Sequence, residues 1–104
     1  MCTTTVTGVD FTLSDRVRRH VADKLGALDT YLTEVVRSDV TIHPMPMHRF
    51  RVDIQLHRDR GTVMAVHAEA DSVYAAINAA AEKAKARLRR LHHKRVDHHA
   101  RGAA

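Results

Sequence analysis

Apolar and polar residues alternate along three short segments of the chain, less decisively in the last, and a fourth segment at the start is rich in β-branched residues and ends at a glycine; both patterns indicate β-strands. The segments are residues 3–8, 34–44, 49–57 and 62–70. The third is the clearest, because its apolar side chains all share one parity. Those side chains are Phe50, Val52, Ile54 and Leu56. In the second segment Val36, Val40 and Ile42 share a parity. The pattern therefore predicts four strands.

Two longer segments repeat their apolar residues every three or four positions, as one face of an α-helix does. The first runs from about Asp15 to Leu32, with Gly26 inside it, and Thr12 or Ser14 can cap it. Its stripe is Val17, Val21, Leu25, Leu28 and Leu32. The second runs from Asp71 to Arg95, and Asp71 or Ser72 can cap it. Its stripe is Tyr74, Ile77, Ala81, Ala84, Leu88 and Leu91.

The resulting order, β-α-β-β-β-α, predicts an α+β fold. We expect a two-layer sandwich in which two helices pack on one face of a four-stranded mixed sheet. The first two strands should be parallel and the last three antiparallel, since a strand–helix–strand unit makes a crossover. The open face would carry Arg49, Arg51, Gln55 and His57. We expect one domain over residues 1–95 and a disordered tail over residues 96–104, where the periodicity is lost.

The second helix also carries a stripe of cations, roughly 120° around its axis from the apolar stripe. We call Lys83, Arg87, Arg90 and Lys94 the basic stripe. Eight lysines or arginines lie between Lys83 and Arg101 against one acid, Asp97, so this stretch carries +7 in a chain of net charge +5. A helix that is charged only for solubility usually intersperses acids at i,i+4. The imbalance instead indicates a polyanionic partner, most commonly a nucleic-acid backbone.

The remaining composition narrows the class of protein. The chain has no long apolar span, and residues 1–10 lack a charged region followed by an apolar run, so we expect no secretion signal. A single cysteine, Cys2, cannot form an internal disulfide. These features are typical of a cytoplasmic protein. Aromatic residues make up only 4% of the chain, so base stacking is not expected to dominate nucleic-acid binding.

Several stretches, in this order, resemble the ribosome hibernation promoting factor family, also called ribosome-associated inhibitor or sigma-factor modulation proteins. They are "VTG", "SDRVRRHVADKLGALDTYL", "FRVDIQLH" and "AEADSVYAAINAAAEKAKARLRRLHHK". Positions that match the family pattern are Asp71, Tyr74, Ala76, Ile77, Lys83, Arg87, Leu88 and Arg90. Positions that depart from it are Val9 and Asp10, where a basic residue is common, Asn78 in place of Asp, and Ala84 in place of Leu.

The resemblance implies a factor that binds the small ribosomal subunit between head and body, over the sites of messenger RNA and of A- and P-site transfer RNA. Such factors inhibit translation and protect idle ribosomes in stationary phase or stress. The chain would be either a short-type factor or the N-terminal domain of a longer one. Its expected partner is ribosomal RNA, with no membrane, cofactor or small-molecule substrate, and we expect a monomer.

We expect the lysines and arginines to contact phosphates rather than bases. The first set is Lys83, Lys85, Arg87, Arg89, Arg90 and Lys94. The second is Arg49 and Arg51 on the open sheet face, followed by Arg58 and Arg60 in the turn after the third strand. Pairing with acids such as Asp39 is an equal alternative for the sheet arginines. Tyr74 is expected in the core rather than on an RNA surface.

Three other functions remain as alternatives. Nine histidines, several of them in "HHKRVDHH", suggest a metal site, but His92 and His93 are adjacent on a helix and no cysteine accompanies them, so we expect none. Small α+β folds can be enzymes, yet the sequence has no Gly-rich phosphate loop and no nucleophile with an evident base, so we expect no catalysis. A protein-binding regulator of the sigma-factor modulator type is the third alternative.

Overall fold

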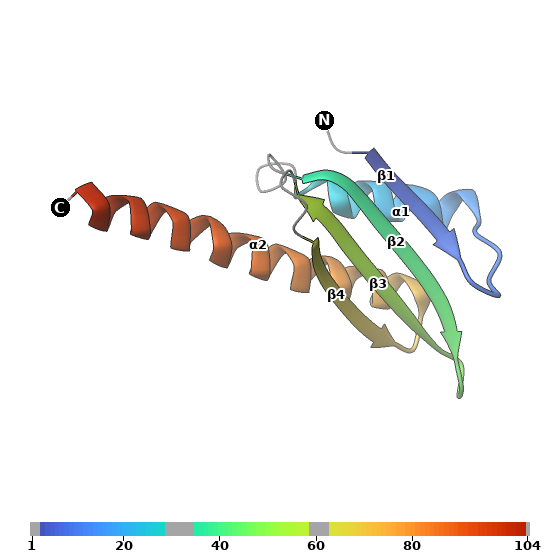
Figure 1. The fold of residues 1–104 in the computed structure, drawn as a ribbon. Coiled ribbons are helices and arrows are strands. Elements are labelled where there is room, and N and C mark those ends of the chain that lie inside the picture. The colour runs from blue at the N-terminus through green and yellow to red at the C-terminus, as the bar shows by residue number, and fades with distance from the viewer. Residues whose placement is uncertain (1–2, 29–34, 59–62, 104) are drawn as a thin grey trace.

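The computed structural model describes residues 3–28, 35–58 and 63–103, and it describes the side chains of the last helix as far as Arg90. The strands are β1 (Thr3–Gly8), β2 (Val35–Met45), β3 (Arg49–Arg58) and β4 (Val63–Ala70), and the helices are α1 (Asp15–Gly26) and α2 (Val73–Ala103). The predicted order β-α-β-β-β-α is confirmed (Figure 1).

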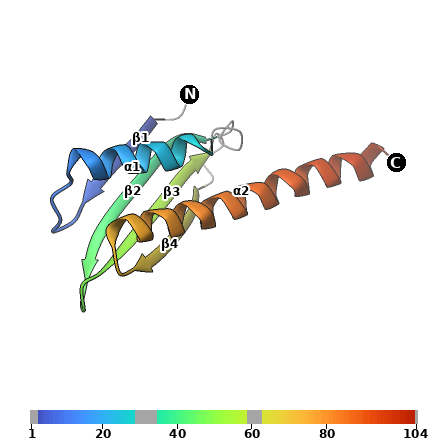
Figure 2. The ribbon, with the colours of Figure 1, turned by 180° about the vertical axis from the view of Figure 1, so that it is seen from behind.

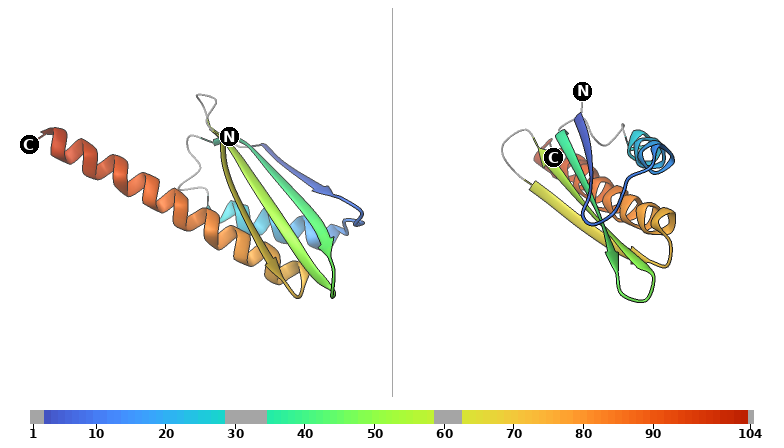
Figure 3. Two further views of the ribbon diagram at one scale, coloured as in Figure 1. Left: turned by 60° about the horizontal axis from the view of Figure 1, so that its bottom comes forward. Right: turned by 90° about the vertical axis from the view of Figure 1, so that its right-hand side faces the viewer.

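The four strands form one sheet in the order β1-β2-β3-β4. β1 pairs with β2 in parallel, whereas the β2–β3 and β3–β4 pairs are antiparallel, as predicted. Both helices lie on the same face of the sheet (Figures 2 and 3). The opposite face carries no layer among the described residues, and β1 and β4 form the two edges.

The core lies between the sheet and the helical layer. From α1 it receives Val17, Val21 and Leu25, which are almost fully buried. The sheet contributes Val40, Ile42, Val52, Ile54, Leu56, Met64, Val66 and Ala68. From α2 it receives Ala76, Ile77, Ala80, Ala81, Ala84 and Leu88. Alanines with no exposed surface allow the α2 backbone to lie close to the strands, because they fill little of the space between the layers.

Each helix begins at a serine that satisfies a free backbone N–H of the first turn. Ser14 Oγ accepts from the Val17 N–H at 3.2 Å, and Ser72 Oγ accepts from the Ala75 N–H at 3.1 Å. Of the alternatives left by the sequence, Ser14 therefore caps α1 and Ser72 caps α2.

Both helix ends differ from the predicted bounds. α1 ends at Gly26, which is its last residue and not an interior one, while residues 29–34, including Leu32, lie outside the described part of the chain. α2 continues to Ala103 where we expected regular structure to end near Arg95, and it projects well beyond the sheet (Figure 1). The division into a domain of residues 1–95 and a tail remains a prediction.

The predicted buried face of β2 is wrong at its first residue. Val36 is 51% exposed, whereas its neighbour Val35 is 4% exposed. The register with β3 shifts between Val35 and Arg37, so a β-bulge reverses the alternation there. After the bulge Ser38, Val40 and Ile42 all face the core.

The connection from β1 to α1 depends on Gly8. A Cβ atom at this position would collide with the backbone carbonyl oxygen of Phe11. Asp10 in the same connection has a positive φ of 55°. The chain therefore turns tightly at the end of β1 before entering α1.

Neither helix, over the part of the chain that the structure describes, combines the length and the apolar character needed to span a membrane.

Candidate nucleic-acid interface

The basic side of α2 is presented to solvent because the alanines of the same helix face the sheet. Lys83, Arg87, Arg89 and Arg90 are exposed, and Lys85 is half-buried. Over Val73–Arg90 the helix contains one acid, Glu82. At 100° per residue, Lys83, Arg87 and Arg90 lie on one flank of the buried alanine face, and Lys85 and Arg89 lie on the other flank. The helix thus presents five predicted cations with little neutralising charge of its own.

Two members of the basic stripe reach across to the edge strand β4. The Lys83 ammonium donates to the carbonyl oxygen of His67 at 2.8 Å, and the Arg87 guanidinium donates to the carbonyl oxygen of Ala65 at 2.7 Å. Alternate residues of an antiparallel edge strand turn their backbone groups away from the sheet. Lys83 and Arg87 therefore cover the outward carbonyls of β4, a role that the sequence did not reveal.

A shallow groove lies between this part of α2 and the β4 edge. Lys83, Arg87 and Arg90 line its helix side, and Ala65 and His67 line its strand side. The cations stay exposed while they make these contacts, so each retains donors that can face a phosphate. The groove is consequently positive on its helix wall, and the carbonyl oxygens of its strand wall accept hydrogen bonds from Lys83 and Arg87.

The predicted sheet arginines are engaged with acids. Arg51 donates from Nε and Nη2 to the Asp53 carboxylate at 3.1–3.3 Å, and this hydrogen bond and charge raise the pKa of Arg51 above its ordinary value. Arg49 forms an ion pair with Asp71 at 3.4 Å, in which Asp71 is 91% exposed. Of the two readings left open by the sequence, the geometry favours pairing for Arg51, whereas the exposed Arg49 pair is weak.

Two histidines share the same carboxylates. His43 Nε2 lies 3.2 Å from Asp53 Oδ2, and His57 Nε2 lies 2.9 Å from Asp39 Oδ2. Arg37, which sequence reasoning did not single out, joins the second cluster through Asp39 at 3.3 Å. In the β2–β3 register Arg37 lies opposite His57, and His43 lies opposite Arg51. An alignment of the two strands in this register would have identified both clusters from the sequence.

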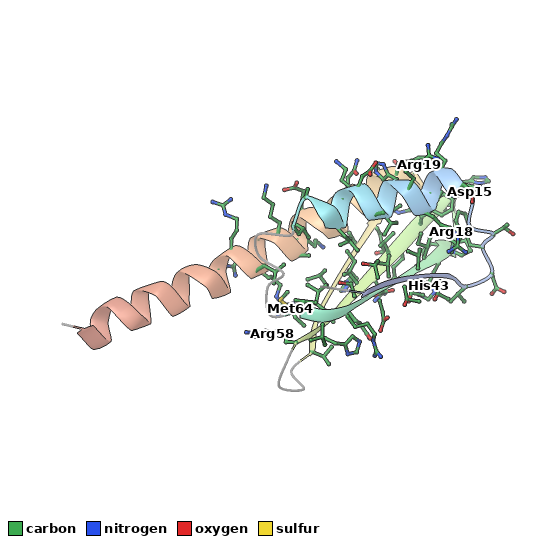
Figure 4. The ribbon with its side chains drawn as sticks, turned by 90° about the horizontal axis from the view of Figure 1, so that it is seen from above. Asp15, Arg18, Arg19, His43, Arg58 and Met64 are labelled. Carbon is green, nitrogen blue, oxygen red and sulfur yellow. The ribbon has the colours of Figure 1, made fainter. Side chains whose placement is uncertain are left out.

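The remaining predicted positions are distributed differently. Arg58 is the last residue of β3 and half-buried, and it lies toward the opposite end of the sheet from His43 (Figure 4). Arg60 lies outside the described residues, and the side chain of Lys94 lies beyond the described part of α2. Tyr74 is half-buried against the core, in agreement with its expected position. Its ring meets the His20 ring edge-on, with 5.1 Å between the ring centroids.

Metal ligation has no support in the described part of the chain. Within residues 3–28, 35–58 and 63–90, no group of three His, Cys, Asp or Glu side chains is arranged to hold an ion. The histidines of "HHKRVDHH" that suggested a metal lie where side chains are not described.

Comparisons with known proteins agree on one family. The model of the family described as Sigma 54 modulation protein / S30EA ribosomal protein matches residues 4–96. A ribosome hibernation promotion factor of Rhizobium meliloti is 32% identical over 95 residues. That match covers 90% of this chain and 50% of the relative, so the chain spans about half the length of the curated protein.

Solved structures show the same fold. The Protein Y N-terminal domain of Thermus thermophilus superposes with a TM-score of 0.75 at 25% identity, covering 88% of this chain and 99% of that one. A ribosomal subunit interface protein of Coxiella burnetii superposes with a TM-score of 0.78 at 20% identity, covering 88% and 97%. The second likeness bears on the fold alone.

Proposed function

The chain belongs to the Sigma 54 modulation protein / S30EA ribosomal protein family, and from this premise we propose that it is a cytoplasmic ribosome hibernation factor that binds small-subunit ribosomal RNA through the basic side of α2. The observation that carries the proposal is the set of exposed cations on α2, Lys83, Arg87, Arg89 and Arg90, in a helix that contains one acid, Glu82, over Val73–Arg90. The name of the Rhizobium meliloti relative supports the hibernation role.

The proposed mechanism is steric occlusion anchored by phosphate contacts. Bound in the channel of the small subunit, the domain would occupy the space that messenger and transfer RNA need. The anchor is electrostatic, because each cation that meets a phosphate releases condensed counterions and adds affinity that falls as salt rises. No chemical step is required of the protein, and inhibition ends when the factor dissociates.

The cations of α2 divide into two groups with different tasks. Lys85, Arg89 and Arg90 make no hydrogen bond to another element that the structure records, and we assign them to RNA alone. Lys83 and Arg87 are held against the carbonyl oxygens of His67 and Ala65. Those contacts restrict their side chains before binding, so less conformational entropy is lost when a phosphate arrives. Lys94 and Arg58 remain additional proposed contacts, as does Arg60.

Co-sedimentation with purified small ribosomal subunits over a salt series tests the proposal. A Lys85→Ala/Arg89→Ala/Arg90→Ala variant leaves the two edge contacts intact, so its loss of binding would report on RNA contact and not on altered packing. We expect wild type to pellet with subunits and to lose affinity steeply as salt rises. The salt dependence of the triple variant should be shallower, by the amount that about two to three phosphate contacts contribute. Circular dichroism of the variant serves as the folding control.

Two outcomes would contradict the proposal. If wild type stays in the supernatant at low salt, the ribosome is not the partner. If the triple variant binds as wild type does, the surface is wrongly assigned. A partner that is bound equally well at high salt would favour the protein-binding regulator, since phosphate-dominated binding weakens under those conditions.

A further inference from the structure

The open face of the sheet carries two clusters of the same composition. In one, Asp39 contacts Arg37 at 3.3 Å and His57 at 2.9 Å. In the other, Asp53 contacts Arg51 at 3.1 Å and His43 at 3.2 Å. Each cluster thus holds one arginine, one carboxylate and one histidine, and each is neutral while its histidine is neutral.

The residues around the two clusters add little to the charge of the open face. β4 contributes His67 and Glu69, which lie opposite Asp53 and Arg51 in the register. The described open-face positions of β1 are threonines, Thr5 and Thr7. The charged groups of the face are therefore Arg37, Asp39, His43, Arg51, Asp53, His57, His67 and Glu69. Arg49 and Asp71 at the rim neutralise each other.

The charge of this face changes sign when its histidines take up protons. With neutral imidazoles, two arginines stand against three carboxylates, a net charge of −1. With the three histidines protonated the net charge becomes +2. Histidine is the side chain that changes charge between pH 5 and 8. On protonation, His43 and His57 would lie within ion-pair distance of the two carboxylates, so each carboxylate would be shared between two cations and each cluster would carry a net charge of +1.

We propose that the open sheet face is a second RNA-binding surface, closed at neutral pH and opened by protonation of His43 and His57. The partner is a phosphate backbone because the face has no Phe, Tyr or Trp for stacking among its described residues and becomes cationic as a whole. The inference rests on the proposed function in taking RNA as the polyanion, but it concerns a different surface from the basic stripe. Protonation of the two histidines also explains how Arg37 and Arg51, which are paired with carboxylates, can contact RNA.

The test is binding of a single-stranded RNA homopolymer, poly(U), to the full chain at pH 8 and pH 5.5, with the salt dependence of affinity measured at each pH. Two additional phosphate contacts should steepen the slope of log K against log salt by about 1.4 at the lower pH. The His43→Gln/His57→Gln variant should bind like wild type at pH 8 and lose that increment. Asp39→Asn/Asp53→Asn should bind more tightly than wild type at pH 8, because it leaves both arginines unopposed.

His48→Gln and His92→Gln/His93→Gln are the matched controls, since they remove histidines outside the two clusters, and both should keep the increment. The proposal is overturned if wild type has the same slope at both pH values, or if the His43/His57 variant keeps the increment. Tighter binding of polyglutamate than of poly(U) at pH 5.5 would overturn the choice of RNA. If wild type does not bind poly(U) at pH 8, the function proposed for α2 is contradicted. The inference on the sheet face is then decided by the difference between pH 8 and pH 5.5 alone.

Discussion

His20 of α1 and Asn78 of α2 are joined by a hydrogen bond of 2.7 Å between the imidazole Nε2 and the amide oxygen Oδ1. The His20 ring also meets Tyr74 edge-on, so one histidine contacts two residues of the facing helix. Both helices contribute buried residues to the core against the sheet. This polar contact additionally fixes how α1 and α2 sit relative to each other.

Replacing Asn78 with alanine should lower the free energy of unfolding by about 1 kcal/mol, because the acceptor for His20 is lost in a partly buried place. Asn78→Asp keeps an oxygen at the same position and should retain most of the stability at pH 8. Urea denaturation of both variants measures the effect. Equal stability of wild type and Asn78→Ala would show that the contact adds nothing.

Removing the cover of the β4 edge should promote self-association. In Lys83→Ala/Arg87→Ala the outward carbonyls of His67 and Ala65 lose their donors, and an edge strand with free backbone groups pairs readily with another chain. We expect sedimentation velocity to detect dimers or larger species, together with a stability loss of about 1 kcal/mol.

Lys85→Ala/Arg89→Ala is the matched control for that experiment. It removes the same charge from the same helix without touching β4, so it should remain monomeric at equal concentration. Self-association of both variants to the same extent would attribute the effect to lowered net charge and not to the exposed edge.

The β-bulge in β2 predicts opposite responses of two adjacent valines. Val35→Ala should cost roughly 2 kcal/mol, because it leaves a cavity in the core. Val36→Ala should stay within about 0.5 kcal/mol of wild type, because this side chain is half exposed. Thermal or chemical denaturation of the pair distinguishes the observed register from one without a bulge, for which the order of the two effects would be reversed.

Two glycines should respond to alanine with opposite signs. Gly8→Ala places a methyl group against the Phe11 carbonyl and should destabilise the domain by roughly 1–3 kcal/mol. Gly26→Ala meets no atom within 4 Å and should stabilise it by about 0.4–1 kcal/mol, since alanine restricts the unfolded chain and suits the last turn of α1. Denaturation midpoints of the two variants suffice as the measurement.

Much of the fold was predictable because it depends on periodicity. The alternation of β3 and the stripe of α1 correctly identified Val52, Ile54, Val17 and Val21 as buried. The stripe assigned to α2 correctly included Ile77, Ala84 and Leu88. It omitted Ala76 and Ala80, which are fully buried, because alanine gives a weak apolar signal.

The parts that failed depend on pairing in space. A bulge reverses parity without any change in composition, so Val36 looked like Val40. The same limit applies to the candidate site. The sequence identified the cations of α2 but not that Lys83 and Arg87 reach backbone oxygens of β4, since carbonyls have no signature in the sequence. The triads around Asp39 and Asp53 likewise require the strand register.

The parallel pairing of β1 with β2 has a consequence for the order in which the fold assembles. β2, β3, β4 and α2 contact their neighbours in sequence, whereas β1 meets β2 only after the chain has passed through the whole of α1. A contact between segments far apart in the sequence forms only after a larger entropic cost of loop closure. We therefore expect β2, β3, β4 and α2 to form early during folding and β1 to dock onto β2 late.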